Sequence, residues 1–254
     1  MSTQRMLLFR RLEVKYLVDR STRTALTRDL LAFMRPDVHA GTDGFYLVRS
    51  CYFDSHDYMA FHEKLAGAAF RDKLRIRVYG VNPGQTPLVR LEVKSRYLDC
   101  VHKITVDVPR ENYDAVQRAI WRRKALPPAD LLSDKGISPE FFRIQRQYNM
   151  EPRILIQYRR QAFEREELGR IRANFDDELL ATRHLDLLGP LRGARRLLEP
   201  GYCIFELKVD DSLPYWMHTL ISKYDLQNQA VCKYCHSVGS RALLSPVGRE
   251  DEAA

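Results

Sequence analysis

The stretch RRLEVKYLV, residues 10–18, decides the fold, because part of it returns twice along the chain. LEVK occupies Leu12–Lys15 and again Leu91–Lys94, and FELK occupies Phe205–Lys208. Successive side chains of a strand point to opposite faces, so in each copy the acid and the lysine share one face and the apolar residues share the other. The surrounding sequence does not repeat, so an internal duplication is not indicated. The three copies instead indicate three strands that each place charged residues on one face and apolar residues on the other.

The same alternation of charged and apolar residues predicts further strands. We expect strands at residues 9–18, 46–53, 70–79, 88–96, 101–108, 153–163, 169–176 and 202–209. Short turns join most of them, and helical segments lie between or after them, at about 19–34, 213–224 and 233–244 among others. Strands in succession with helices at the edges favour an α+β fold with a largely antiparallel sheet. We expect one domain over residues 1–244 and a disordered tail at 245–254.

The charged faces of these strands have two interpretations. In the first, the charged faces form the solvated side of an ordinary two-faced antiparallel sheet. In the second, they line the interior of a closed antiparallel eight-stranded barrel with surrounding helices. The second is favoured because seven strands all select Arg, Lys or an acid, whereas a solvated face mixes in Ser, Thr and Gln. The expected lining is Lys15, Arg75, Arg77, Lys94, Lys103, Arg160, Arg172 and Lys208, interleaved with Glu13, Glu92, Asp176 and Glu206.

The charge balance indicates the kind of ligand. The 254 residues include 41 Lys and Arg against 33 Asp and Glu, a formal charge of +8, which favours an anionic partner. Many cations in a confined interior repel one another unless a multiply charged anion lies between them, and a few carboxylates suit Mg²⁺ or Mn²⁺. The pattern predicts a polyphosphate or triphosphate site. Neither a P-loop nor a Rossmann glycine motif is present.

Five cysteines and no secretory signal indicate reduced thiols in a cytoplasmic protein. Cys232 and Cys235 form a C-x-x-C without a second pair at zinc-ribbon spacing, so a zinc or redox role for them stays open. Apolar runs are too short for a membrane segment. We expect no nucleic-acid partner, because the basic residues are confined to one interior face. The sequence leaves the oligomeric state open.

Eight motifs in order carry a family resemblance. They are LEVKY at the first strand, YFDS (52–55), EKLAG with R-x-K-x-R-I-R-x-Y (63–79), LEVK (91–94), QYRRQAF (157–163), IRANFD (171–176), FELK (205–208) and CKYC (232–235). Together they resemble the VTC domain, the polyphosphate polymerase domain of the triphosphate tunnel metalloenzyme superfamily, over about residues 9–241. Arg11 replaces the first acid of the E-x-E-x-K motif of hydrolytic tunnel enzymes, which fits the more basic VTC pattern.

The resemblance implies a barrel that transfers the terminal phosphoryl group of ATP to polyphosphate with Mn²⁺ or Mg²⁺. The implied catalytic residues are Lys15, Arg75, Arg77, Lys94, Arg160 and Lys208. The resemblance adds Arg172 and Lys233 as phosphate-binding residues, and Lys103 joins them because its parity places it on the charged face. Glu206 is implied as the principal metal ligand, and Glu92 and Glu13 are further candidates. Two alternatives stay open: a tripolyphosphatase or nucleoside triphosphatase on the same fold, and a non-catalytic polyphosphate-binding module.

Overall fold

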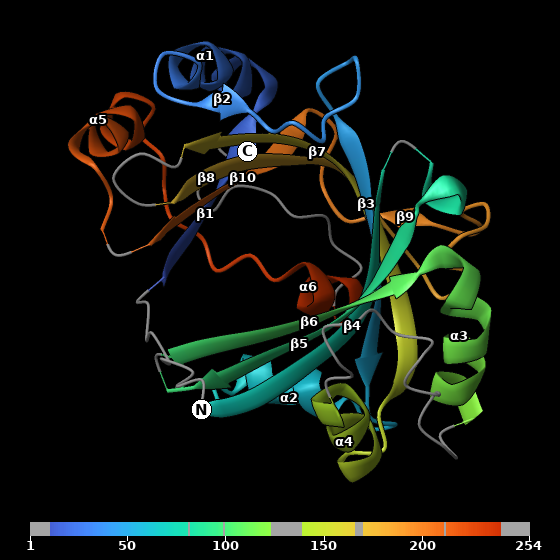
Figure 1. Ribbon diagram of the computed structural model, residues 1–254. Coiled ribbons are helices and arrows are strands. Elements are labelled where there is room, and N and C mark those ends of the chain that lie inside the picture. The colour runs from blue at the N-terminus through green and yellow to red at the C-terminus, as the bar shows by residue number, and fades with distance from the viewer. Residues whose placement is uncertain are drawn as a thin grey trace, which may run out of the picture.

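A single antiparallel sheet dominates the computed structural model (Figure 1). The structure describes residues 11–80, 82–98, 100–122, 139–165, 170–210 and 212–239. The tail predicted to be disordered, and the start of the first predicted strand, lie outside these residues. The eight long strands are β1 (Arg11–Asp19), β3 (Tyr46–Asp54), β4 (Phe70–Gly80), β5 (Leu88–Tyr97), β6 (Cys100–Pro109), β7 (Glu151–Arg165), β8 (Ile171–Thr182) and β10 (Tyr202–Asp210).

These strands agree with the expected ones, and the differences lie at their ends. β8 continues past Asp176 to Thr182, because it keeps pairing with β7 as far as Leu155. An irregularity in that pairing near Gln157 accompanies the left-handed backbone of Glu178 (φ 51°). Two strands of two residues each, β2 (Arg35–Pro36) and β9 (Arg195–Arg196), pair with β7 and β8. The alternating pattern did not reveal them because two residues show no period.

The sheet curls, but pairing within the described residues does not close it. The strand order is β1-β10-β8-β7-β3-β4-β5-β6, so β1 and β6 form its two edges (Figure 1). A closed eight-stranded barrel is therefore not confirmed. In place of a backbone ladder across the opening, the Nζ of Lys94 on β5 donates to the Oε2 of Glu13 on β1 at 3.2 Å. Residues 100–103 at the start of β6 are exposed, which agrees with an uncovered edge.

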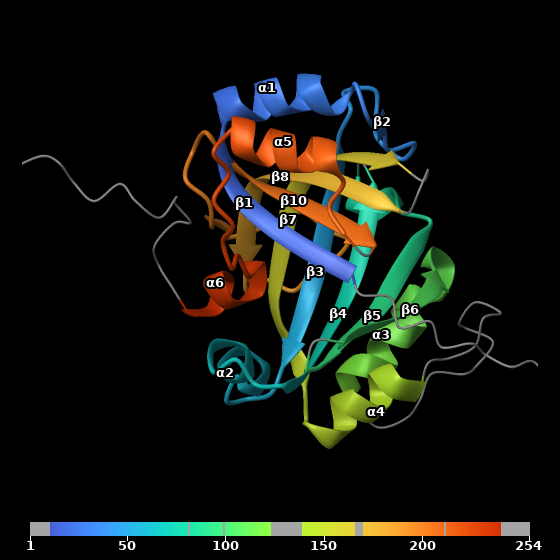
Figure 2. The same cartoon turned by 90° about the vertical axis from the view of Figure 1, so that its left-hand side faces the viewer.

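Helices cover the convex side of the sheet (Figures 1 and 2). α1 (Arg20–Leu30) and α5 (Tyr215–Lys223) lie beside β1, β8 and β10, whereas α2 (Met59–Leu65), α3 (Tyr113–Arg122) and α4 (Pro139–Gln147) lie by the other half. Single 3-10 turns stand at Pro83–Gln85 and Arg110–Asn112. Asp19 caps α1, because its side chain accepts a hydrogen bond from the Thr22 amide at 2.8 Å.

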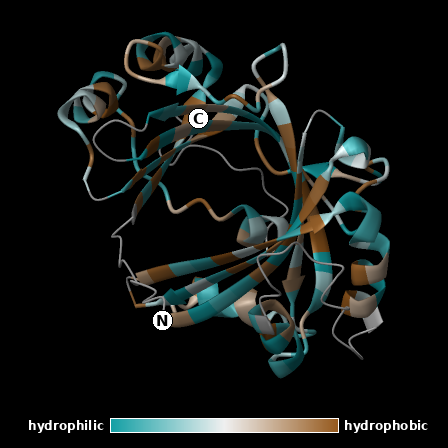
Figure 3. Ribbon diagram, viewed as in Figure 1, coloured by the Kyte–Doolittle hydropathy of each residue, from teal (hydrophilic) through white to brown (hydrophobic). Residues whose placement is uncertain are grey.

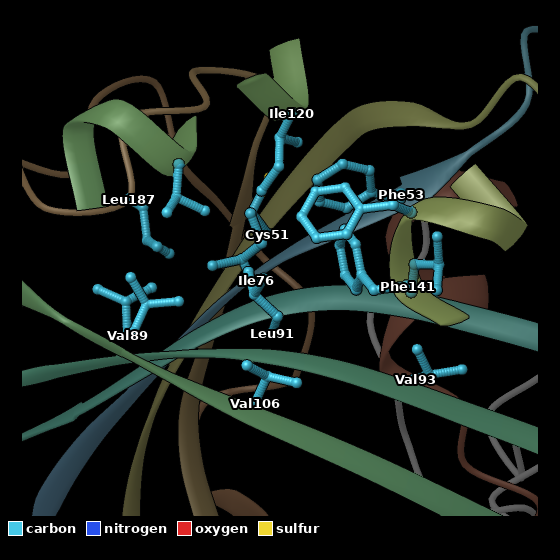
Figure 4. Close-up of a cluster of buried hydrophobic side chains, with 14 of the residues drawn as sticks. Cys51, Phe53, Ile76, Val89, Leu91, Val93, Val106, Ile120, Phe141 and Leu187 are labelled. Carbon is cyan, nitrogen blue, oxygen red and sulfur yellow. The ribbon is translucent and has the colours of Figure 1, made fainter. Parts of the chain in front are cut away.

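Two apolar clusters fill the space between the sheet and these helices. One joins β1, β8 and β10 to α1 and α5, and in it the rings of Phe175 and Phe205 stack with centroids 4.7 Å apart. The other packs Leu91 and Ile76 of the sheet against Phe141 of α4 and Ile120 of α3 (Figure 4). Along the strands, hydrophilic and hydrophobic residues alternate as the sequence pattern predicts (Figure 3). In β4 and β5, and over most of β1 and β10, the apolar side chains belong to these outer clusters.

The last described helix, α6 (Lys233–Gly239), lies within the curve of the sheet (Figure 1). It belongs to a third apolar cluster, formed with inward residues of β3 and β7 such as Val48 and Ile156. The rings of Tyr234 and Tyr52 stack at 5.4 Å, and the Tyr234 hydroxyl donates to the buried carboxylate of Asp54. These contacts hold Cys232 and Lys233 against the concave face.

Candidate functional site

The strand register confirms that the charged residues share the concave face. Lys15 lies opposite Glu206 on the neighbouring strand, and Glu13 lies opposite Lys208. In the other half, Arg75 lies opposite Glu92 and Lys94 lies opposite Lys103. Residues directly opposite each other in an antiparallel pair point to the same side.

A buried carboxylate, Glu206, lies at the centre of the first charge cluster. Its side chain receives Lys208 Nζ at 3.1 Å, Arg160 Nη2 at 3.4 Å and Lys15 Nζ at 3.6 Å. Burial alone would raise the pKa of this carboxyl group, but Lys208 and Lys15 hold the pKa of Glu206 well below its usual value. Glu206 is therefore ionised throughout the physiological range.

Asp176 extends this cluster toward α6. Its side chain is fully buried and receives two hydrogen bonds from Arg160, Nε to Oδ1 at 2.6 Å and Nη2 to Oδ2 at 2.8 Å. The Nζ of Lys233 approaches the same Oδ2 at 2.6 Å. A planar guanidinium facing both oxygens of a carboxylate is the strong, geometrically specific form of ion pair. Asp176 was expected on the lining but not as a partner of two of the predicted phosphate-binding residues.

The second charge cluster surrounds Glu92, which is 2% exposed. Arg75 Nε donates to its carboxylate, Lys103 Nζ lies 2.5 Å away and Arg77 Nε lies 3.9 Å away. Burial would raise the pKa of Glu92, but Arg75 and Arg77 lower it instead. The guanidinium groups also lie over tyrosine rings, Arg75 at 5.9 Å from Tyr52 and Arg77 at 5.7 Å from Tyr79.

Lys94 and Glu13 join the two clusters. Lys94 donates to Glu13 at 3.2 Å, and Glu13 also contacts Lys15 at 3.0 Å. The half-exposed Lys94 and Lys103 are the more accessible cations of this face. Arg172 is the outlier: it pairs with Glu164 at 3.6 Å and is 38% exposed at its side chain, so the structure places it beside the clusters and not within them.

The expected lining did not include Lys73, a further cation of the concave face. Lys73 has the same parity as Arg75 and Arg77 and lies opposite Lys94 in the register. Its Nζ lies 3.6 Å from the Sγ of Cys232. The signal was present in the R-x-K-x-R-I-R motif, since every second residue of a strand faces the same way.

A divalent metal fits one place on this face. Glu13 and Glu206 both contact the Nζ of Lys15, at 3.0 and 3.6 Å, which brings two hard carboxylates together. Mg²⁺ is commonly held by one or two carboxylates together with substrate phosphates. Glu92 stands apart among its own cations, and within the described part of the chain no group of three or more His, Cys, Asp or Glu residues could enclose an ion. The residues therefore suit a metal that shares its coordination with a phosphate ligand.

Comparison with known proteins agrees with this geometry. The VTC domain family matches residues 10–241, nearly the whole chain. The chain belongs to the VTC domain family. No curated protein gives a match to its sequence. Among the described helices of this VTC domain, none has the length and apolar composition that crossing a bilayer requires.

Solved structures resemble this VTC domain at low identity. A Bacillus halodurans protein named as a "putative adenylate cyclase" is 13% identical and has a TM-score of 0.51, covering 90% of this chain and 96% of its own. A Hippeastrum protein, named as a "putative adenylyl cyclase" with a dominant triphosphatase activity, is 10% identical, with a TM-score of 0.49 and coverages of 89% and 95%. The first likeness shows a shared fold and nothing about the reaction.

Proposed function

We propose that this VTC domain is an ATP-dependent polyphosphate polymerase, which transfers the terminal phosphoryl group of ATP to a polyphosphate chain on its concave face. One observation carries the proposal: among the described residues, the contacts of the two charge clusters, with Lys73 beside them, bring together nine cations and four carboxylates. The cations are Lys15, Lys73, Arg75, Arg77, Lys94, Lys103, Arg160, Lys208 and Lys233, and the carboxylates are Glu13, Glu92, Asp176 and Glu206.

This excess of positive charge suits a linear polyanion. The two clusters stand on opposite halves of the curled sheet and are joined through Lys94 and Glu13. A chain of phosphates that lies between them reaches cations from both halves, whereas a single small anion reaches only one. An extended ligand with a charge on every unit therefore uses the whole face.

Phosphoryl transfer asks the protein mainly to align donor and acceptor and to neutralise charge. Arg75 and Arg77 present planar guanidinium groups that tyrosine rings hold in place, which suits contact with two phosphate oxygens at once. Lys94 and Lys103 offer mobile point charges. An acceptor phosphate is already ionised at neutral pH, so no general base is required. A divalent ion, Mn²⁺ or Mg²⁺, held by Glu206 and Glu13, would supply additional neutralisation of phosphate charge.

Incubation of the purified chain with ATP and Mn²⁺ or Mg²⁺ tests the proposal. Products are sized on a gel and treated with an exopolyphosphatase. Polymer that the exopolyphosphatase degrades supports the polymerase. Release of orthophosphate from short chains without elongation would instead indicate a tripolyphosphatase, and tight anion binding without turnover would indicate a binding module.

A matched pair of variants tests the site. Arg75→Gln removes a cation that contacts Glu92 on the concave face. Arg159→Gln removes an arginine of β7 that pairs with Asp43 at 3.1 Å on the exposed side. We expect the first to lower the rate about a hundredfold or more, as loss of one charge-stabilising donor does, and the second to keep it. Equal rates in the two variants would exclude the concave face as the reaction site.

A further inference from the structure

Two cysteines meet at the edge of the charged face. Cys232 directly precedes α6, and Cys235 is the third residue of that helix. Their Sγ atoms lie 2.8 Å apart, and the Cys235 amide points to the Cys232 sulfur at 3.4 Å. A disulfide bond is about 2.05 Å long, so the two free thiols need to approach by less than about 1 Å to bond. No role in phosphate binding accounts for this pair.

The environments of the two thiols differ. Cys232 is half-buried and its sulfur lies 3.6 Å from the Nζ of Lys73, whereas Cys235 is buried in the apolar cluster around α6. The hydrogen bond from Cys235, together with the charge of Lys73, lowers the pKa of Cys232 to about 4 against the opposing effect of burial. The pKa of Cys235 is raised in turn, because its thiol proton is held by Cys232. One sulfur is thus a thiolate and the other a thiol.

We propose that Cys232 and Cys235 form a reversible dithiol–disulfide site, oxidised by a small disulfide compound, that sets the anion affinity of the concave face. The formation of the disulfide does not depend on the proposed function. Its effect on the concave face does rest on the proposed function, since that effect concerns the binding of phosphate chains.

The redox step follows from the difference between the sulfurs. The Cys232 thiolate is the more accessible and reactive form, and it attacks one sulfur of the small disulfide, releasing one thiolate and forming a mixed disulfide. The Cys235 thiol then transfers its proton to the departing thiolate while its sulfur displaces the small group from Cys232. The protein loses two electrons and the small disulfide gains two, ending as one thiol and one thiolate, which takes up a proton from water.

Oxidation changes the charge beside Lys73. In the reduced protein the Cys232 thiolate offsets this ammonium group at 3.6 Å. Both sulfurs of a disulfide are neutral, so the concave face gains one net positive charge and Lys73 loses its anionic neighbour. Lys73 stands opposite Lys94 in the register and shares a face with Arg75. A phosphate chain on this face therefore gains a cation in the oxidised form.

The other cysteines do not offer the same chemistry. Cys51 and Cys203 are buried in the two outer apolar clusters, where burial raises the pKa of each to about 12. Cys100 is exposed at the start of β6. It therefore serves as the accessible control thiol, and Cys100→Ser removes it without touching the concave face.

A thiol count tests the disulfide. The full chain and its Cys100→Ser variant are equilibrated with mixtures of reduced and oxidised glutathione, alkylated in acid and digested for mass spectrometry. We expect a Cys232–Cys235 disulfide in both proteins and none in Cys232→Ser or Cys235→Ser. Alkylation of both Cys232 and Cys235 after exposure to oxidised glutathione alone would overturn the site.

Calorimetry with sodium tripolyphosphate tests the effect on affinity. Reduced and oxidised Cys100→Ser protein are compared, and we expect the oxidised form to bind about three- to tenfold tighter, as one extra charge at short range implies. Lys73→Met should remove the difference, because the charge that oxidation exposes is then missing. Equal affinities of the two forms would overturn the regulation and leave the disulfide site standing. Binding to neither form would refute the proposed function and the regulation with it, whereas the thiol count would still decide the site.

Discussion

Asp176→Asn offers a quantitative test of the charge network. The Asp176 side chain is fully buried and is the shared partner of Arg160, at 2.6 and 2.8 Å, and of Lys233, at 2.6 Å. The substitution keeps the shape of the side chain and removes its charge, which leaves two buried cations without this partner. Glu206 remains 3.4 Å from Arg160 and compensates only in part.

The expected cost follows from that burial. Removing one partner of a buried ion pair costs about 3–5 kcal/mol, because the remaining charge is desolvated and uncompensated. For a chain of this size each kcal/mol lowers Tm by roughly 2–4 °C, so we expect a loss of roughly 6–20 °C. Urea unfolding followed by tryptophan fluorescence measures the free energy, and calorimetry measures the Tm.

The neighbouring residue provides the control. Asp177 points to the other face and pairs with Arg23 at 2.6 Å, with 27% of its side chain exposed. Partly exposed pairs contribute about 0–1 kcal/mol, so Asp177→Asn should be nearly neutral. Tripolyphosphate should restore more stability to Asp176→Asn than to the wild type, because it supplies the missing negative charge and binds only the folded state. A loss of stability no larger than that of Asp177→Asn would refute the reasoning.

Three further changes test other parts of the structure. Burial raises the pKa of Tyr79, but Arg77 and Arg75 lower it to about 8. The phenolate that forms above that pH offsets the charge of Arg77, so tripolyphosphate should bind more weakly at about pH 9 than at about pH 7 when binding is measured by calorimetry. Tyr79→Phe should reduce this difference. Iodoacetamide at about pH 6 should alkylate Cys232 faster than the exposed Cys100, because only the thiolate reacts; the reverse order, seen by mass spectrometry, would contradict the ionised state of Cys232. Phe175→Ala should lower the free energy of unfolding by about 3–5 kcal/mol through the cavity it leaves beside Phe205, and a loss under about 1 kcal/mol in urea would show that this core collapses around the gap.

Period-two alternation made most of the sheet predictable. In segments such as 89–96 and 205–209, charged or polar and apolar residues alternate so regularly that one register buries the apolar side, and a shift of one residue would reverse it. That constraint is enough to assign Lys15, Arg75, Lys94 and Glu206 to the charged face of their strands. The two-residue strands β2 and β9 carry no such alternation and depend on their neighbours.

The sequence pattern could not predict which charged side chains form ion pairs with one another. Parity assigns a side chain to a face but does not say which cation meets which carboxylate, because that depends on strand order and on the curl of the sheet. Lys233 meets Asp176 from a different element, and Lys94 reaches Glu13 across the opening between the sheet edges. We expected three candidate metal ligands, of which the resemblance implied only Glu206. The structure brings Glu13 and Glu206 together and leaves Glu92 among its own cations.

The sequence by itself determined the strands, the face of most residues and the excess of positive charge on one face, because alternation and charge are local properties. Only the tertiary structure decided that no pairing among the described residues joins β1 to β6 and that α6 lies inside the curve of the sheet. The tertiary structure also shows that the two cysteines of the C-x-x-C motif lie next to each other and that Cys232 lies beside Lys73. These features arise from contacts between residues far apart in the chain, where the energy of a charge depends on which neighbours surround it and how much water they exclude.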